Sequence, residues 1–157
     1  MLRDAVLGDL SEQEMEELLR SETIGRLGCH AAGMTYVVPV AYAFDAGYVY
    51  SHSPEGRKIR MMRRNPEVCF EVDHIVSIND WKSVIGWGRY EELSGDAGRL
   101  GVDLVTRRLA EPSLGSTGAP SYPLRWAQSR PPDPDGPAVV AYRIRLGRMR
   151  GRFERPD

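Results

Sequence analysis

Short turns separate most of the extended segments of this sequence, and they limit how those segments can pair. Strand patterns rich in Val, Tyr and Phe occupy Tyr36 to Phe44 and Tyr48 to Tyr50, with only Asp45-Ala46-Gly47 between them. A parallel crossover needs about a dozen residues or more, whereas so short a turn joins antiparallel neighbours. The sequence therefore predicts a mainly antiparallel sheet in which these two segments form a hairpin.

Four further segments have the character of strands. Val68 to Val72 alternates apolar with polar residues, and Trp81 to Leu93 is a longer pattern with a bulge expected at Gly86 or Gly88. The other two are Thr23 to His30 and Ala138 to Leu146. These segments bring the prediction to about six strands.

Three segments are predicted to be helical. Ser11 followed by Glu14 is a capping box, which predicts a helix from Glu12 to about Arg20. Arg57 to Arg64 forms a short helix that ends before Pro66, because the residue preceding proline avoids the helical region. Asp96 to Ala110 has apolar residues at helical spacing. The predicted fold is mainly β, a small six-stranded antiparallel barrel with peripheral helices.

The 157 residues fit a single domain. Residues 111–137 are rich in Pro, Gly and Ser and are interpreted as a long loop, in which Trp126 is expected near a pocket or a partner. Trp81 and Trp87 are further candidates for a contact surface, or are core residues. Pro39 lies inside a strand pattern without an N–H to donate, so it is expected at an edge, at a bulge or facing a ligand.

Composition excludes several classes of function. The formal net charge of -1 argues against general nucleic-acid binding, and no stretch approaches the ~20 apolar residues of a membrane span. No signal peptide is visible and the two cysteines do not form a disulfide scaffold, so a cytoplasmic protein is expected. No metal site is predicted, because no metal-binding spacing exists among Cys29, His30, His52, Cys69, Asp73 and His74.

The segment from Tyr50 to Pro66 carries the strongest chemical signal. A strand runs into a small, polar loop that opens a helix with Gly56-Arg57-Lys58. Free N–H groups at a helix start favour an anion, and Arg57 and Lys58 add two cationic side chains there. The pattern predicts a phosphate pocket at the end of a sheet. The alternative is an ordinary solvated helix start.

Several weak motifs, taken in order, resemble the pyridoxamine 5′-phosphate oxidase-like, FMN-binding split-barrel family. They are Val38-Pro39-Val40-Ala41-Tyr42, Gly47-Tyr48-Val49-Tyr50-Ser51-His52, Gly56-Arg57-Lys58 and Asn65-Pro66-Glu67-Val68-Cys69-Phe70. His52 after Tyr-Ser, with Gly-Arg-Lys following, looks most like the branch that includes nitroimidazole-resistance proteins. The C-terminal substrate motif of the true pyridoxamine 5′-phosphate oxidases is not found, which argues against vitamin B6 oxidation.

The resemblance implies a split barrel that forms a homodimer, with FMN at the subunit interface. Carried over by position, Val38, Pro39, Val40 and Ala41 would contact the isoalloxazine ring through their backbone. The ribityl chain and phosphate would be flanked by Tyr50, Ser51 and His52, held by Arg57 and Lys58, and contacted by the hydroxyl of Ser83. Arg57 can make a bidentate contact with phosphate.

The implied function is an FMN-dependent oxidoreductase, of the flavin reductase or nitroreductase kind, which uses a nicotinamide electron donor and a small organic acceptor. Three alternatives stay open: a non-catalytic flavin-binding module, a haem or deazaflavin-coenzyme binder on the same fold, and a structural dimer whose pocket has lost its cofactor. His52 is the candidate catalytic residue, since its ordinary pKa is near neutrality. A structural hydrogen bond from His52 is favoured over catalysis, because nothing nearby in sequence orients it as an acid or base.

Overall fold

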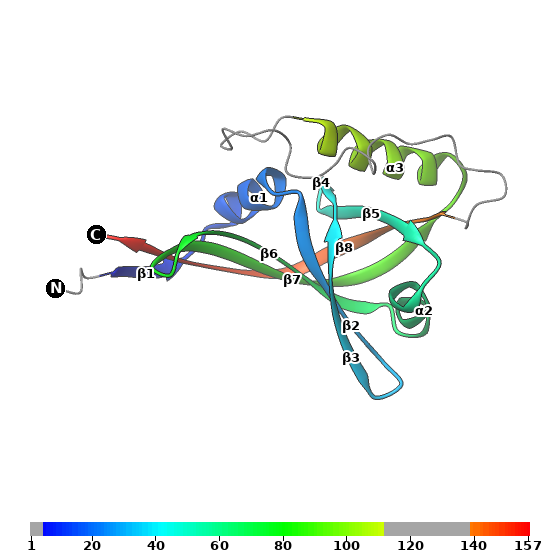
Figure 1. Cartoon of the computed structure of the whole chain (residues 1–157), viewed down its shortest axis with the longest axis horizontal. Coiled ribbons are helices and arrows are strands. Elements are labelled where there is room, and N and C mark those ends of the chain that lie inside the picture. The colour runs from blue at the N-terminus through cyan, green and yellow to red at the C-terminus, as the bar shows by residue number, and fades with distance from the viewer. Residues whose placement is uncertain (1–4, 112–138) are drawn as a thin grey trace.

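Antiparallel pairing joins every strand in the computed structural model, which describes residues 5–111 and 139–157. The sheet order is β3-β2-β6-β7-β8-β5-β4, with β1 paired to β8 (Figure 1). The strands are β1 (Ala5–Asp9), β2 (Ile24–Ala31), β3 (Met34–Ala41), β4 (Ala43–Asp45), β5 (Tyr48–Pro54), β6 (Glu67–Ser77), β7 (Asp80–Leu93) and β8 (Val139–Pro156). The helices are α1 (Glu12–Ser21), α2 (Arg57–Arg64) and α3 (Gly95–Ala110). Residues 112–138, with Trp126 and nearly all of the expected loop, lie outside the described residues.

The predicted class, an antiparallel β fold with peripheral helices, is confirmed. All three helices lie where they were expected, and Ser11 and Glu14 form both hydrogen bonds of the capping box. The register of β7 against β8 shifts between Gly86 and Gly88, at the predicted bulge. The described residues contain eight strands rather than six. β1 was not predicted, and the single strand predicted over Tyr36 to Phe44 is interrupted at Tyr42, which divides it into β3 and β4.

The predicted hairpin of Tyr36–Phe44 with Tyr48–Tyr50 is correct only at its end. Ala43–Asp45 pairs with Tyr48–Tyr50, but β3 pairs along its whole length with β2. The turn between β2 and β3 is made by Ala32 and Gly33, both at positive φ (51° and 75°). Two successive positive φ angles match the twist of a tight hairpin, but alanine is a rare residue there and gives little sequence signal.

The sheet curls into a barrel that does not close. β3 forms one edge of the strand order and β4 the other, although Tyr42 alone separates them in the chain. No backbone hydrogen bond joins β3 to β5 among the described residues. We call this unpaired line between β3 and β5 the seam. Pro39 therefore lies in an edge strand, one of the positions predicted for it.

Apolar side chains from both ends of the sheet fill the barrel. Tyr42, Phe70 and Tyr142 are almost fully buried, and the ring edge of Tyr42 packs on Phe70 with centroids 4.8 Å apart. Leu18 and Leu19 bring α1 into this core, and the hydroxyl of Tyr42 donates to the carbonyl of Leu19 (2.7 Å).

The other two helices cover different parts of the barrel. α2 closes one end of it, and α3 packs over β4 and β5 (Figure 1). Gly101 allows the close approach to β5, because a Cβ there would lie 3.4 Å from Tyr50 Cδ1, and also 3.1 Å from Leu93 Cδ1 at the end of β7. No helix among the described residues has the length and apolar character needed to cross a membrane.

We predict that Gly25→Ala destabilises the fold. A Cβ at this buried position would lie 2.2 Å from Phe70 Cζ and 2.9 Å from the carbonyl oxygen of Glu71. Overpacking of this kind typically costs about 1–3 kcal/mol, which urea unfolding would measure. Gly147→Ala is the matched control, since its nearest contact would be an ordinary 3.5 Å. Equal stability of the two variants would contradict the close packing of β2 on Phe70.

Candidate functional site at the seam and the start of α2

Apolar burial and one arginine fix α2 in place. Ile59 and Met62 are fully buried in the barrel end. Arg63 donates two hydrogen bonds to the carboxylate of Glu92 on β7 (2.9 and 2.6 Å) and also pairs with Glu55 just before the helix. Bidentate pairs of this kind are geometrically specific. The N-terminal turn of α2 is therefore held at the end of β5, beside the seam.

The two cations predicted for a phosphate both lie on the first turn of α2. Among the described residues, no carboxylate lies within 4.0 Å of either Arg57 or Lys58, whereas Arg63 on the same helix has two. The Gly56 N-cap has no side chain to accept from the free N–H groups of this turn. The first turn of α2 thus presents positive charge and unsatisfied donors together.

Burial separates the two cations. Arg57 is exposed and lies 5.8 Å from the ring centre of Tyr36, while Lys58 is half-buried and burial lowers its pKa. The solvated alternative fits Arg57 but not Lys58, because a desolvated ammonium without a carboxylate costs free energy. Lys58 is thus a cation that is partly desolvated and has no carboxylate within 4.0 Å in the part of the chain that is described.

His52 is placed on β5 just before this turn. It is half-buried, and its pKa is lowered first by burial and then by the positive charge of Lys58. Its imidazole is therefore neutral near pH 7, with one nitrogen as donor and the other as acceptor. A neutral imidazole suits a hydrogen bond better than proton donation from an imidazolium.

The β3 segment meets β5 across the seam. The hydroxyl of Ser51 donates to the carbonyl of Ala41 (2.8 Å), which ties the two edges at one point. Val38 and Val40 turn their side chains toward the core and Pro39 is exposed. Backbone groups of this strand face the seam without a strand partner in the described part of the chain. Contact through backbone, as the resemblance implies, is thus the kind these residues can offer.

Two predicted residues lie away from the seam. The ring of Tyr50 is 9% exposed and packs with Ala43 and Val105 beneath α3, on the opposite face of β5 from Ser51. Ser83 lies on β7, in register with Asp73 and Arg152, and β2 and β6 separate it from β3. Within one chain Ser83 is not brought together with Arg57 and Lys58.

Two residues near the site were not predicted to contribute. The hydroxyl of Tyr142 is buried without a hydrogen-bond partner among the described residues, in register with Ser51, and burial raises its pKa to about 12. Cys29 is buried, which raises its pKa, and the charge of Lys58 acts in the opposite direction. Their strands were predicted, but only the pairing of distant strands brings these side chains near β5 and α2.

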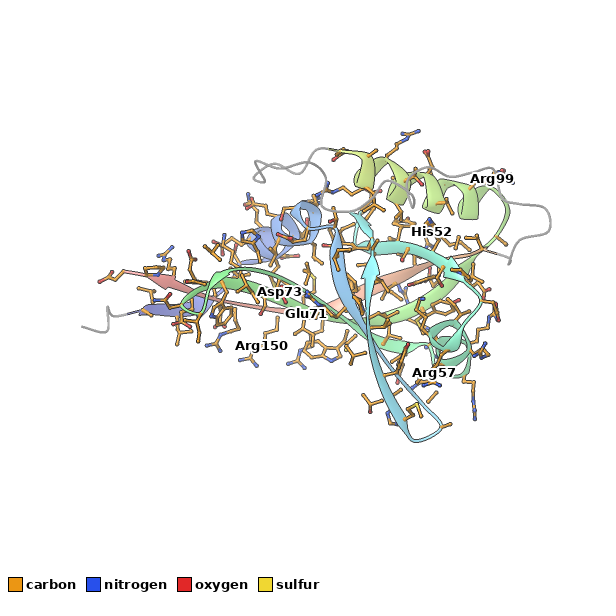
Figure 2. All side chains as sticks on the ribbon, in the orientation of Figure 1. His52, Arg57, Glu71, Asp73, Arg99 and Arg150 are labelled. Atoms are coloured by element: carbon orange, nitrogen blue, oxygen red, sulfur yellow. The ribbon has the colours of Figure 1, made fainter. Side chains whose placement is uncertain are left out.

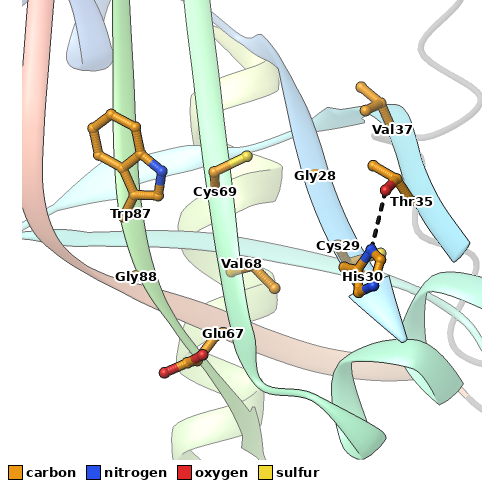
Figure 3. A pocket seen from close by; sticks show the side chains of 10 residues that line it. All are labelled: Gly28, Cys29, His30, Thr35, Val37, Glu67, Val68, Cys69, Trp87 and Gly88. Carbon is orange, nitrogen blue, oxygen red and sulfur yellow. Dashed lines mark hydrogen bonds between the residues drawn. The ribbon is translucent and has the colours of Figure 1, made fainter. Parts of the chain in front are cut away.

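A groove of about 360 Å³ opens on the face of β2, β3, β6 and β7 that points away from the barrel core (Figure 3). Its floor is Gly28, over which the thiol of Cys69 lies, and Val37 and Trp87 flank it. His30 and Thr35 share a hydrogen bond at one end (3.0 Å). None of the predicted site residues lines this groove. No three His, Cys, Asp or Glu side chains gather as metal ligands in residues 5–111 or 139–157.

Comparison with known proteins places this geometry in context. A family model described as pyridoxamine 5′-phosphate oxidase matches residues 11–153. The crystal structure of an FAD-binding protein from Mesorhizobium loti is 31% identical, with a TM-score of 0.75, and the match covers 97% of this chain and 99% of that one.

Two further similarities are more distant or shorter. A candidate 5-nitroimidazole antibiotic resistance protein from Bacteroides thetaiotaomicron is 19% identical with a TM-score of 0.67, covering 97% of this chain and 90% of that one, which shows a common fold. An uncharacterised protein of Rhizobium meliloti is 35% identical over 89 residues, which span 57% of this chain and 59% of that protein.

We predict that His52 makes stability fall in mild acid. The pKa of His52 is lowered in the folded chain, so below its ordinary value of about 6.5 the unfolded chain binds more protons. The stabilisation is complete above that pH and is lost as pH drops toward 5. His52→Gln should reduce the slope of unfolding free energy against pH, measured with urea between pH 5 and 7.5. An unchanged slope would contradict the burial of a neutral imidazole.

Proposed function

Because the chain belongs to the pyridoxamine 5′-phosphate oxidase family, we propose that it binds a flavin nucleotide, FMN, at the seam. The phosphate would be held by the first turn of α2 and the ring would lie along the edge of β3. The similar Mesorhizobium loti protein is described as FAD-binding, which supports a flavin and makes FAD the other nucleotide to test for. The proposed activity is that of a flavin-dependent oxidoreductase acting on a small organic acceptor.

The observation that carries this proposal is the half-buried ammonium of Lys58. Burial lowers its pKa, and no carboxylate lies within 4.0 Å of it among the described residues. A phosphate dianion would supply the missing counter-charge and would also accept from the free N–H groups of α2. Arg57 would add a fork of donors at the more exposed side.

The seam fits the rest of a flavin nucleotide. Its ring system needs a flat slot with hydrogen-bonding groups at one edge. β3 is an edge strand, so among the described residues the backbone groups of Val38–Ala41 that do not face β2 are free of a strand partner, and at Pro39 the group on offer is the carbonyl acceptor alone. The side chains of Val38 and Val40 stabilise this edge from inside the core. The buried Tyr142 hydroxyl, without a partner in the described chain, adds a polar group beside Ser51.

A bound flavin would supply two-electron chemistry, accepting a hydride from a reduced nicotinamide and passing two electrons, with protons from solvent, to the organic acceptor. The chain's own residues would bind the flavin and orient its ring. Lys58 and Arg57 neutralise phosphate charge, the β3 backbone fixes the ring, and neutral His52 donates one hydrogen bond. No Ser-His-Asp or paired-carboxylate machinery is required for this role.

The same proposal includes a homodimer. A ligand lying in an open seam has one side facing away from its own barrel, and a second copy would cover it. Ser83, which lies away from the seam in its own chain, would then reach a flavin only from the other copy.

We predict that Arg57→Ala and Lys58→Ala each weaken flavin binding more than tenfold. Each removes a charge-assisted contact of about 1.5–3 kcal/mol, and about 1.4 kcal/mol corresponds to a factor of ten. Affinity would be measured by titrating the apoprotein with FMN and with FAD and following flavin fluorescence.

The controls for that experiment are the single variants Arg64→Ala, on the last turn of α2, and Lys82→Ala, on β7, each of which removes one positive charge outside the first turn of α2. If the control variants weakened flavin binding equally, the loss of affinity would be a general effect of charge and would not support a phosphate site at α2. Unchanged affinity of the Arg57 and Lys58 variants would remove the phosphate site from α2. A wild-type chain that takes up neither nucleotide would overturn the proposed function.

His52→Gln distinguishes binding from turnover. Since glutamine keeps a hydrogen-bond donor at β5, we expect flavin affinity within about threefold of wild type and turnover largely retained. Turnover would be followed as nicotinamide oxidation with a nitroaromatic or quinone acceptor under anaerobic conditions. Retained flavin with turnover reduced about a hundredfold or more would instead make His52 catalytic.

A further inference from the structure

None of the residues proposed to bind flavin lines the groove over Gly28, and the shape of this groove suits a flat molecule. Trp87 stands on one side of it and Val37 on the other (Figure 3). A Cβ on Gly28 would lie 2.6 Å from Cys69 Sγ, so only glycine leaves the floor free of a side chain at this point. At about 360 Å³ the groove has the size of a small ligand pocket.

The ring of Trp87 forms an aromatic wall that already attracts a cation. It is 43% exposed, and the guanidinium carbon of Arg148 lies 5.7 Å from the ring centre. A positive charge over the face of a tryptophan is attracted by the electrons of the ring. Arg148 has no carboxylate within 4.0 Å in the described part of the chain, so no ion pair accounts for its position.

The acids next to the groove belong to β6. Glu67 and Glu71 lie two residues before and two residues after Cys69, so all three face the same side of the sheet. Glu67 lines the groove (Figure 3), and it has no cationic side chain within 4.0 Å in residues 5–111 or 139–157. Glu71 lies about 7 Å beyond Cys69 along the strand.

Glu71 has too little positive charge around it. Figure 2 shows Glu71 beside Asp73 on the same part of β6. Arg26 on β2 lies 3.2 Å from Asp73 and 3.9 Å from Glu71, so one guanidinium serves two carboxylates. These carboxylates are only 24% and 30% exposed. Burial, and after it the charge of Asp73, raises the pKa of Glu71 to about 7. A further cation would relieve this imbalance.

The arginines around the groove do not supply that cation. Arg26 is already shared between Asp73 and Glu71. Arg89 and Arg148 are exposed, so water compensates their charge, whereas it compensates a partly buried carboxylate less well. The electrostatic imbalance at the groove therefore favours a positively charged ligand.

We propose that the groove over Gly28 binds a small, flat aromatic molecule that carries a positive charge. Its ring lies over Gly28 between Trp87 and Val37, and its charged nitrogen lies toward the acids of β6. The bound cation replaces the guanidinium of Arg148 at the ring of Trp87. This site goes beyond the proposed function, because it uses neither the seam nor the first turn of α2.

Ligands of similar shape and different charge test the proposal. N-methylquinolinium is positive, quinoline is neutral at pH 7.5 and naphthoate is negative. Calorimetric titration of the full chain without flavin should show N-methylquinolinium binding at least about tenfold more tightly than naphthoate, with quinoline between them. Equal affinity for the three ligands, tighter binding of naphthoate, or no binding of N-methylquinolinium would overturn the proposal.

Two substitutions should change cation binding in opposite directions. Glu71→Gln removes an attraction and should weaken binding of N-methylquinolinium about threefold or more. Arg148→Gln removes a competing cation from Trp87 and should strengthen it by a similar factor. Glu12→Gln on α1 removes an equal negative charge elsewhere and should have no effect. Affinity that is unchanged in both groove variants would contradict the role of charge.

Trp87→Leu tests where the ligands bind. It removes the aromatic wall of an exposed position, so all three ligands should bind more weakly. The matched control is Trp81→Leu, about 20 Å away along β7 and on the same face, which should leave binding unchanged. Circular dichroism establishes that each variant folds. A folded Trp87→Leu variant with wild-type affinity would remove the ligand from the groove.

The flavin proposal and this proposal fail separately. Glu71, Trp87 and Arg148 lie outside the first turn of α2, so their variants should bind FMN as wild type does. A chain that binds N-methylquinolinium but no flavin would leave the groove site standing. A chain that binds FMN but no aromatic cation would leave only the flavin site.

Protonation supplies a second readout, because N-methylquinolinium keeps its charge at every pH. Glu71 is faced by Asp73 on its own strand and by Arg26 on β2, while Ile85 on β7 does not titrate. A bound cation lowers the pKa of Glu71 from about 7, so binding releases protons and should strengthen as pH rises from 6 to 7.

Glu71→Gln should remove this pH dependence of cation binding. Histidine also titrates near neutrality, so His30→Gln at the end of the groove is the control and should leave the dependence in place. A dependence that persists in Glu71→Gln, or disappears in His30→Gln, would contradict the role of Glu71.

Discussion

Tyr42 holds the two edges of the sheet beside each other without allowing them to pair. Its backbone N–H donates to Thr23, as if β3 continued along β2, and its hydroxyl donates to Leu19 at the end of α1. Its ring is fully buried against Phe70. The chain thus leaves one edge of the sheet and enters the other at a single anchored residue. The seam follows from this anchor, because β3 and β4 diverge at Tyr42 and β3 has no strand partner on the side that faces β5 in the described chain.

The helices are arranged around this opening. α1 supports the anchor through the carbonyl of Leu19, and α2 follows directly from β5, one of the two strands that border the seam. The bidentate pair of Arg63 with Glu92 then ties α2 to β7 across the barrel. The position of Lys58 relative to β3 therefore depends on contacts at three separate places in the sequence. Such placement gives a binding site rigidity that a free loop would lack.

Local sequence signals predicted the elements well and their pairing less well. The capping box at Ser11 and the end of α2 before Pro66 are set by neighbouring residues, so they could be read directly. The pairing of β3 with β2 depends on a turn at Ala32 and Gly33, where alanine adopts a conformation that Asn or Asp adopts more readily. Nothing in the sequence of β3 alone distinguishes β2 from β5 as its neighbour.

In the candidate site, too, residues set by local sequence were predictable and residues brought together by strand pairing were not. Arg57 and Lys58 were predictable because a helix start and its cations are adjacent in sequence. The buried hydroxyl of Tyr142 and the thiol of Cys29 lie on strands far away in the chain. Only strand pairing places Tyr142 beside Ser51 and brings Cys29 close enough to Lys58 for its charge to act on the thiol. The row of Glu71, Ile85 and Arg150 is likewise a product of pairing, because these residues become neighbours only once β6, β7 and β8 are in register.

Lys58 and Glu71 represent the same physical situation with opposite sign. Each is partly desolvated with too little opposite charge nearby in the described chain, and in each case burial shifts the pKa toward the neutral form. Such groups lower the stability of the isolated chain, and the loss is recovered when a counter-charge binds to the folded state only. An anion at α2 and a cation at β6 would each stabilise the native fold by this route. The stability of the chain would therefore depend on what it binds at both places, and a folded monomer without ligand would be its least stable form.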